Sequence, residues 1–157
     1  MELIVVPRSK VAKHLLSASR GALYKSLISI GDPGSALPPG YRKVSSRLRL
    51  EFQDIVDASD PLAPTLREVD QLLAYAPTVA RLGGRCLVHC EAGISRSTAA
   101  GIIVLRAILG PGSEAEAVSI VVAQVPEASP NSRMIALADQ RLGGDEAIAR
   151  AIAAHRA

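Results

Sequence analysis

The chain has 157 residues, of which 48% are hydrophobic and only 3% aromatic, so it can form one domain with a core of aliphatic side chains. Its net charge of +3 is uneven, because residues 1–50 hold nine of the 18 Lys and Arg but two of the 15 Asp and Glu. This basic half could attract an anionic substrate or partner, but it has no block of consecutive basic residues and little of the aromatic interleaving that is typical of nucleic-acid binding. No apolar run is long enough for a membrane helix, and the segment before Pro7 is too short for a secretory signal, so we expect a cytoplasmic protein without a membrane span.

The first half of the chain is predicted to alternate between strands and helices. Apolar or alternating runs predict strands at residues 2–7, 24–31 and 46–52, and a turn followed by the fourth strand within residues 83–90. The 3.6-residue periodicity predicts helices at residues 9–18, 63–76, 97–110, 114–125, 130–143 and 145–155. Between the second and third strands, residues 31–40 are rich in Gly and Pro and form a loop.

Two of these helices carry specific start and stop signals. In the first, Ser9 marks the start, and the apolar positions are Val11, Leu15 and Leu16. In the second, Thr65 is the predicted N-cap, and Glu68, three residues later, completes a capping box. Pro77 is expected to kink or end this helix.

The order of elements predicts the fold class. Strands and helices alternate at first, and helices dominate afterwards, which is typical of an α/β protein. We expect one domain over residues 1–157, with a central, mostly parallel sheet of four to five strands, helices on both faces and a helical C-terminal half. In such sheets ligands bind at the carboxyl ends of the strands, and Cys90 ends the fourth strand, immediately before a helix.

The two cysteines of the chain, Cys86 and Cys90, are predicted to be free thiols. Four residues apart in a strand, their Cα atoms would be about 13 Å apart, whereas a disulfide requires less than about 7 Å. No cluster of histidines accompanies them, so we expect no zinc site and no cofactor.

Cys90 and Arg96 form a C-x5-R motif between the fourth strand and the following helix. Backbone N–H groups of such a loop can converge on one anion, and Gly93 lets the backbone adopt the necessary angles. Arg96 offers a planar guanidinium that can bind two phosphate oxygens. The phosphate-binding residues predicted from the motif are Glu91, Ala92, Gly93, Ile94, Ser95 and Arg96.

This environment predicts a reactive Cys90, since positive partial charges lower the pKa of a cysteine and produce a nucleophilic thiolate at neutral pH. The chemistry expected is covalent phosphoryl transfer, in which Cys90 attacks phosphorus and an acid protonates the leaving oxygen. Ser97 can donate a hydrogen bond to the departing thiolate when water releases the phosphate. His89 is expected to support the loop by hydrogen bonding. The alternative interpretation of Cys90 is an inert residue of the core.

The string from Val88 to Ala99, "VHCEAGISRSTA", resembles the signature of the cysteine-dependent protein tyrosine phosphatases, most closely the dual-specificity branch in a small, bacterial-type single domain. A second segment, "SPNSRMIALADQRL", resembles the last core helix of that family, whose Pro-Asn pair packs behind the phosphate loop; this implies a supporting role for Asn131. The resemblance covers residues 45–142 well, and residues 1–44 match only in their strand and helix pattern.

The resemblance implies a general-acid aspartate on a loop upstream of the nucleophile. Asp54, Asp57 and Asp60 are the candidates. Phe52-Gln53-Asp54 resembles the F-x-D pattern that carries the acid in several relatives, which favours Asp54, whereas the spacing to Cys90 favours Asp57. Asp60, beside Pro61, is typical of a turn or cap residue.

The function implied is a phosphatase that acts on a phosphorylated protein, on tyrosine and in part serine or threonine, or on a small phosphomonoester. Phosphate, sulfate or vanadate should occupy the loop. The signature loop contains no lysine, which argues against a polyphosphorylated substrate. The basic first fifty residues nevertheless leave a phosphoinositide as an alternative substrate. A catalytically idle module that binds phosphorylated partners is a competing hypothesis, and a sulfur-transfer enzyme is a third with less support.

Overall fold

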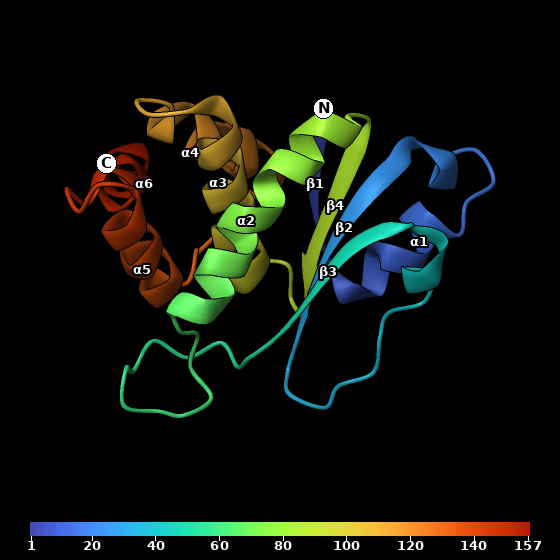
Figure 1. Cartoon of the computed structure of the whole chain (residues 1–157), viewed down its shortest axis with the longest axis horizontal. Helices are drawn as coiled ribbons and strands as arrows, with labels where there is room; N and C mark the ends of the chain where they lie inside the picture. The colour runs from blue at the N-terminus through green and yellow to red at the C-terminus, as the bar shows by residue number, and fades with distance from the viewer.

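The structure is a computed structural model that describes residues 1–157, and its centre is one sheet of four parallel strands (Figure 1). The strands are β1 (Glu2–Pro7), β2 (Tyr24–Gly31), β3 (Ser46–Glu51) and β4 (Arg85–Cys90). Their order is β1-β4-β2-β3, so β4 lies between two neighbours. This position explains the nearly continuous apolar character of β4, whose residues are buried on both faces from Cys86 to Cys90. The prediction of a mostly parallel sheet of four to five strands is confirmed.

Helices cover both faces of the sheet, as predicted, but unequally (Figure 1). They are α1 (Val11–Leu15), α2 (Leu66–Leu82), α3 (Arg96–Leu109), α4 (Glu114–Gln124), α5 (Ser132–Leu142) and α6 (Ala147–Arg156). One face packs against α1 and forms a small core that includes Val11, Leu15, Leu27 and Leu87. The other face packs against α2, α3 and α4. No helix combines the length and the hydropathy that a membrane crossing requires.

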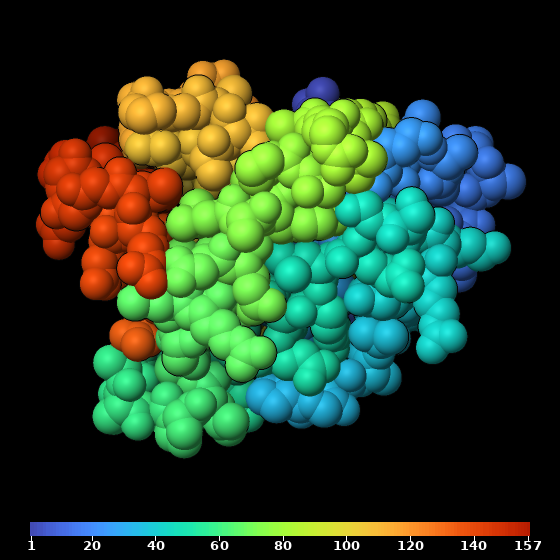
Figure 2. All heavy atoms as spheres, in the orientation of Figure 1, coloured from blue at the N-terminus to red at the C-terminus, as the bar shows by residue number.

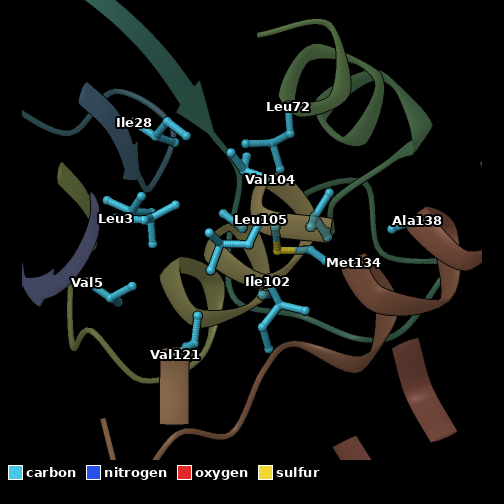
Figure 3. Close-up of a cluster of buried hydrophobic side chains, with 14 of the residues drawn as sticks. Leu3, Val5, Ile28, Leu72, Ile102, Val104, Leu105, Val121, Met134 and Ala138 are labelled. Atoms are coloured by element: carbon cyan, nitrogen blue, oxygen red, sulfur yellow. The ribbon is translucent and has the colours of Figure 1, made fainter. Parts of the chain in front are cut away.

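Helix α3 is the centre of the larger core. Every residue from Arg96 to Arg106 is buried, and the helix contacts α2, α4 and α5 as well as the sheet. Figure 3 shows its Ile102 and Leu105 among side chains from the surrounding elements, including Leu72 and Met134. Because α3 is enclosed in this way, its N-terminus has a rigid position next to the carboxyl end of β4.

Helix α2 begins as predicted but does not end where expected. The Thr65 hydroxyl accepts from the backbone N–H of Arg67, and the Glu68 carboxylate accepts from Thr65 N, which completes the capping box. The helix then continues through Pro77 to Leu82. Pro77 removes one backbone hydrogen bond, but Val79, beyond it, is fully buried, so packing against the core outweighs this loss.

Helix α1 is shorter than the predicted segment 9–18. A 3-10 turn at Arg8–Lys10 precedes it, and Ser9 makes no capping hydrogen bond. Val11 and Leu15 pack on the sheet, whereas Leu16, which the apolar pattern placed with them, is 52% exposed. Leu16 keeps a helical backbone conformation, and at 3.6 residues per turn its side chain lies about 100° around the helix axis from that of Leu15, away from the sheet.

Candidate active site

Residues 91–95 form a tight loop that joins β4 to α3 at the carboxyl edge of the sheet. Gly93 has a φ of +73°, a left-handed conformation that side chains disfavour. A Cβ at this position would also lie 2.5 Å from the backbone nitrogen of Pro7, at the end of β1. Both the backbone angle and the contact with β1 therefore require glycine at position 93.

The hydrogen bonds of this loop leave all but one of its amides free. Three of its carbonyls accept from the surrounding scaffold: that of Glu91 from Arg8 N, that of Ile94 from Ser129 N, and that of Ser95 from Asn131 N. The N–H of Gly93 donates to Cys90 Sγ, and the other loop amides and that of Arg96 have no partner within the chain. A loop beside a helix N-terminus whose carbonyls are hydrogen-bonded and whose N–H groups are free is suited to binding an anion.

Cys90 lies at the base of this loop and is 3% exposed. Its Sγ accepts from the Gly93 N–H at 3.3 Å and lies 3.1 Å from Ser97 Oγ. Ser97 is fully buried in the first turn of α3, so its hydroxyl is held toward the sulfur. The structure therefore brings together the predicted nucleophile and the predicted donor to its thiolate.

Arg96 is buried, and its guanidinium is anchored on one side. Its Nη1 donates to Asp32 Oδ1 at 2.8 Å and to the carbonyl of Phe52 at 2.7 Å. The Nε and Nη2 atoms have no partner within the chain, so one edge of the guanidinium remains available for two oxygens of an anion.

Of the three candidate acids, Asp54 contacts the loop. Its Oδ1 accepts from Ser95 Oγ at 2.6 Å and from Asn131 Nδ2 at 2.9 Å. Asn131 in turn caps α5, because its Oδ1 accepts from the backbone N–H of Met134. Two donors thus hold one oxygen of Asp54 and leave the other, Oδ2, unpaired.

Asp57 and Asp60 are both used by local turns. The Asp57 carboxylate accepts from the backbone N–H and the hydroxyl of Ser59, and these hydrogen bonds lower the pKa of Asp57. Asp60 accepts from the N–H of Leu62, as expected for a turn residue. Neither side chain contacts the loop of Cys90.

Comparison with known proteins relates this arrangement to one superfamily. No family model matches the chain, but rat and mouse dual specificity protein phosphatase 15 are both 35% identical to it over 85 residues. That match covers 51% of the chain and 36% of each relative, so the chain corresponds to about a third of the relatives' length.

Solved structures share the fold over almost the whole chain. The human tyrosine phosphatase-like serine/threonine/tyrosine-interacting protein has a TM-score of 0.68 at 23% identity, covering 88% of this chain and 89% of its own. DUSP15 has a TM-score of 0.62 at 24% identity, covering 97% and 90%. PTPMT1 in complex with PI(5)P has a TM-score of 0.60 at 18% identity, covering 99% and 95%.

The chain has the fold of dual-specificity phosphatase-like proteins of the protein tyrosine phosphatase superfamily, and half of it is similar in sequence to one of them. The resemblance found in the sequence is therefore confirmed, and the fold extends it to the first 44 residues, where the sequence matched only in its pattern of elements.

In this phosphatase-like domain, His89 connects the base of the loop to the neighbouring strands. Its Nε2 lies 2.7 Å from Ser29 Oγ, which also accepts from Arg49 Nη1, and its Nδ1 lies 3.4 Å from the Cys90 carbonyl. Burial lowers the pKa of His89 to about 4, and the nearby arginines act in the same direction. The imidazole is therefore neutral at physiological pH, and it supports the loop by hydrogen bonding.

We expect the free energy of unfolding to fall as the pH is lowered from 6.5 to about 4, because the unfolded chain protonates His89 in this window and the folded chain does not. The contribution of His89 is up to about 3 kcal/mol. Urea unfolding of the wild type and of His89→Gln over this range measures it. The variant should show a flatter pH dependence below pH 6.5 and the same one above pH 7; an unchanged slope below pH 6.5 contradicts the assignment.

The second thiol of this domain, Cys86, has no contact with the site. It is a fully buried, free thiol, and burial raises its pKa to about 11. Such a thiol is protonated and unreactive at neutral pH, which fits a packing role in the core. No group of three or more His, Cys, Asp or Glu side chains is placed to hold a metal ion.

Asp32 is the contact of the site that sequence reasoning missed. It follows β2 in the Gly- and Pro-rich loop, and its side chain reaches Arg96 across the edge of the sheet. The signal available was positional: the carboxyl ends of β2 and β4 meet at the same edge, because the two strands are parallel neighbours.

Proposed function

We propose that the chain is a phosphatase that hydrolyses phosphomonoesters through a phosphocysteine intermediate, with phosphorylated proteins as its substrates. The observation that carries this proposal is the arrangement of Cys90 Sγ at the base of a loop of free amides, beside the available edge of Arg96. Asp54, held against the same loop, supplies the acid. The 35% identity to dual specificity protein phosphatase 15 supports the same reaction class.

In the first step, Cys90 Sγ attacks phosphorus, and the bond from phosphorus to the ester oxygen breaks. The loop amides and the Nε and Nη2 groups of Arg96 bind the remaining phosphate oxygens, and Asp54 Oδ2 delivers a proton to the leaving oxygen. In the second step, water attacks phosphorus and gives a proton to the Asp54 carboxylate. The bond from phosphorus to sulfur breaks, and the Gly93 N–H and Ser97 hydroxyl stabilise the thiolate.

The direct test is hydrolysis of an aryl phosphate by the purified chain in the presence of EDTA, with vanadate as a competitive inhibitor. Turnover that withstands EDTA and is inhibited by vanadate supports the proposal. Tight vanadate binding without turnover would instead favour an idle phosphate-binding module, the alternative suggested by the structural likeness to a phosphatase-like interacting protein.

A phosphoinositide is the second candidate substrate. One structural neighbour is a complex of PTPMT1 with PI(5)P, and the first fifty residues of this chain are strongly basic. Against it, the loop from Glu91 to Ser95 contains no lysine or arginine. Comparing kcat/KM for a phosphotyrosyl peptide and a monophosphorylated inositol lipid in detergent distinguishes the two substrates.

We expect Asp32→Asn to lower kcat/KM for an aryl phosphate by about tenfold and to weaken vanadate inhibition, because Asp32 anchors Nη1 and thereby orients the free edge of Arg96. Asp70→Asn is the matched control, since it removes another Asp–Arg pair with a separation of 2.8 Å, between Asp70 and Arg141. Tighter vanadate binding by Asp32→Asn would contradict this role and identify Asp32 as a competitor of the anion.

A further inference from the structure

The first fifty residues place unpaired positive charge on one side of the molecule. Figure 2 shows most of this segment, in blue to cyan, gathered at one side. Its two acidic residues are both neutralised, because Glu2 pairs with Arg85 and Asp32 with Arg96. The exposed basic residues of the α1 side that have no carboxylate partner are Lys10, Lys13, Arg20, Arg42, Lys43 and Arg47.

Exposed leucines lie within the same surface. Leu16, directly after α1, is 52% exposed, and Leu37, in the loop after β2, is 41% exposed. Both line one shallow hollow, and its other lining residues are Pro38, Gly40, Tyr41, Arg42 and Lys43. A Cβ at Gly40 would lie 3.3 Å from the Leu16 side chain, so the loop and the end of α1 are in contact. We call this surface, made of the two leucines and the six basic residues, the basic-leucine surface.

We propose that the basic-leucine surface docks the chain on a membrane that contains anionic phospholipids. A bilayer of this kind offers negative headgroups to the basic residues and, just below them, an apolar layer to the leucines. A nucleic acid would satisfy the charges alone, and the surface has few aromatic side chains on which bases could stack. The combination of exposed aliphatic side chains with cations that have no carboxylate partner is therefore complementary to a lipid surface.

The proposal is independent of the chemistry at Cys90, because the side chains of the basic-leucine surface are not part of the catalytic loop. Membrane docking also accounts for two features in which the catalytic site has no part, namely the charge asymmetry of the chain and the exposure of Leu16. Docking would bring the domain to phosphorylated substrates held at the membrane.

The test is cosedimentation with vesicles of phosphatidylcholine alone or with about a third phosphatidylserine, in the absence of any substrate. The wild type should bind only the anionic vesicles, and binding should be lost when NaCl is raised from about 0.1 to about 0.5 M, because salt screens the charges. Leu16→Ser combined with Arg42→Glu should weaken binding by about tenfold or more. Leu16→Ser alone should weaken it by a few fold.

The matched control is Arg81→Glu combined with Leu82→Ser, which changes an exposed arginine and an exposed leucine at the end of α2. It should bind anionic vesicles within about twofold of the wild type. Circular dichroism melting of all variants verifies folding, since every substituted side chain is exposed. The proposal would be overturned if the control lost as much vesicle binding as the test variant, or if the wild type did not bind anionic vesicles. It would also be overturned if Leu16→Ser left binding unchanged and a single-stranded oligonucleotide bound equally well.

Discussion

Cys90→Ser should lower the turnover of an aryl phosphate by about 10⁴-fold or more, because the serine hydroxyl is not ionised at neutral pH and cannot replace the thiolate as a nucleophile. The substitution is nearly isosteric, and the sulfur is enclosed by the Gly93 amide and Ser97 at 3.3 and 3.1 Å. The loop should therefore keep its geometry and its affinity for an anion. Steady-state kinetics give the first quantity, and calorimetric titration with tungstate or phosphate gives the second.

Cys86→Ser is the control, since it removes the other thiol of β4 without touching the loop. Its turnover per folded molecule should remain close to that of the wild type. Turnover that survives in Cys90→Ser, or that is lost equally in both variants, would exclude Cys90 as the nucleophile.

Asp54→Asn should reduce kcat by about 10²- to 10⁴-fold on a tyrosyl or alkyl phosphate, the range that general acid catalysis contributes. The asparagine carbonyl can still accept from Ser95 and Asn131, so the side chain keeps its position and loses only the proton it delivers. An activated ester with a good leaving group needs less protonation, so its hydrolysis should be reduced much less. The measurement is kcat for a series of aryl phosphates that differ in leaving-group pKa.

The comparison that decides the acid is with Asp57→Asn, which should behave like the wild type across the series, because Asp57 is bound to Ser59 in a turn. A steep dependence on the leaving group in Asp57→Asn, with a normal one in Asp54→Asn, would reverse the assignment.

The elements of the fold were largely predictable from local patterns. Period-2 and continuous apolar runs correctly indicated all four strands, and the Thr65–Glu68 capping box correctly indicated the start of α2. Two local rules failed. Proline was expected to interrupt the helix at Pro77, but packing of the buried Val79 keeps the helix intact. The apolar pattern grouped Leu16 with Val11 and Leu15, whereas its side chain points into solvent.

The choice between two aspartates shows why the site was only partly predictable. The F-x-D pattern favoured Asp54 as the acid, and the spacing to Cys90 favoured Asp57. Separation along the sequence does not show where a loop folds back in space. The hydrogen bonds from Ser95 and Asn131 distinguish Asp54, and these partners lie 41 and 77 residues away in the chain. Asp32 was not predicted as a residue of the site for the same reason, because its partner Arg96 lies 64 residues away in the chain.

By itself, the sequence determined the α/β order of elements and the Cys90–Arg96 motif at a junction of strand and helix, because hydrophobic periodicity and short loop spacing are local properties. Only the tertiary structure decided which carboxylates meet that loop, which edge of Arg96 is free and which basic residues remain unpaired. Those features depend on long-range contacts between the carboxyl ends of parallel strands and on the burial of one face of each helix, and neither is encoded in the spacing of neighbouring residues.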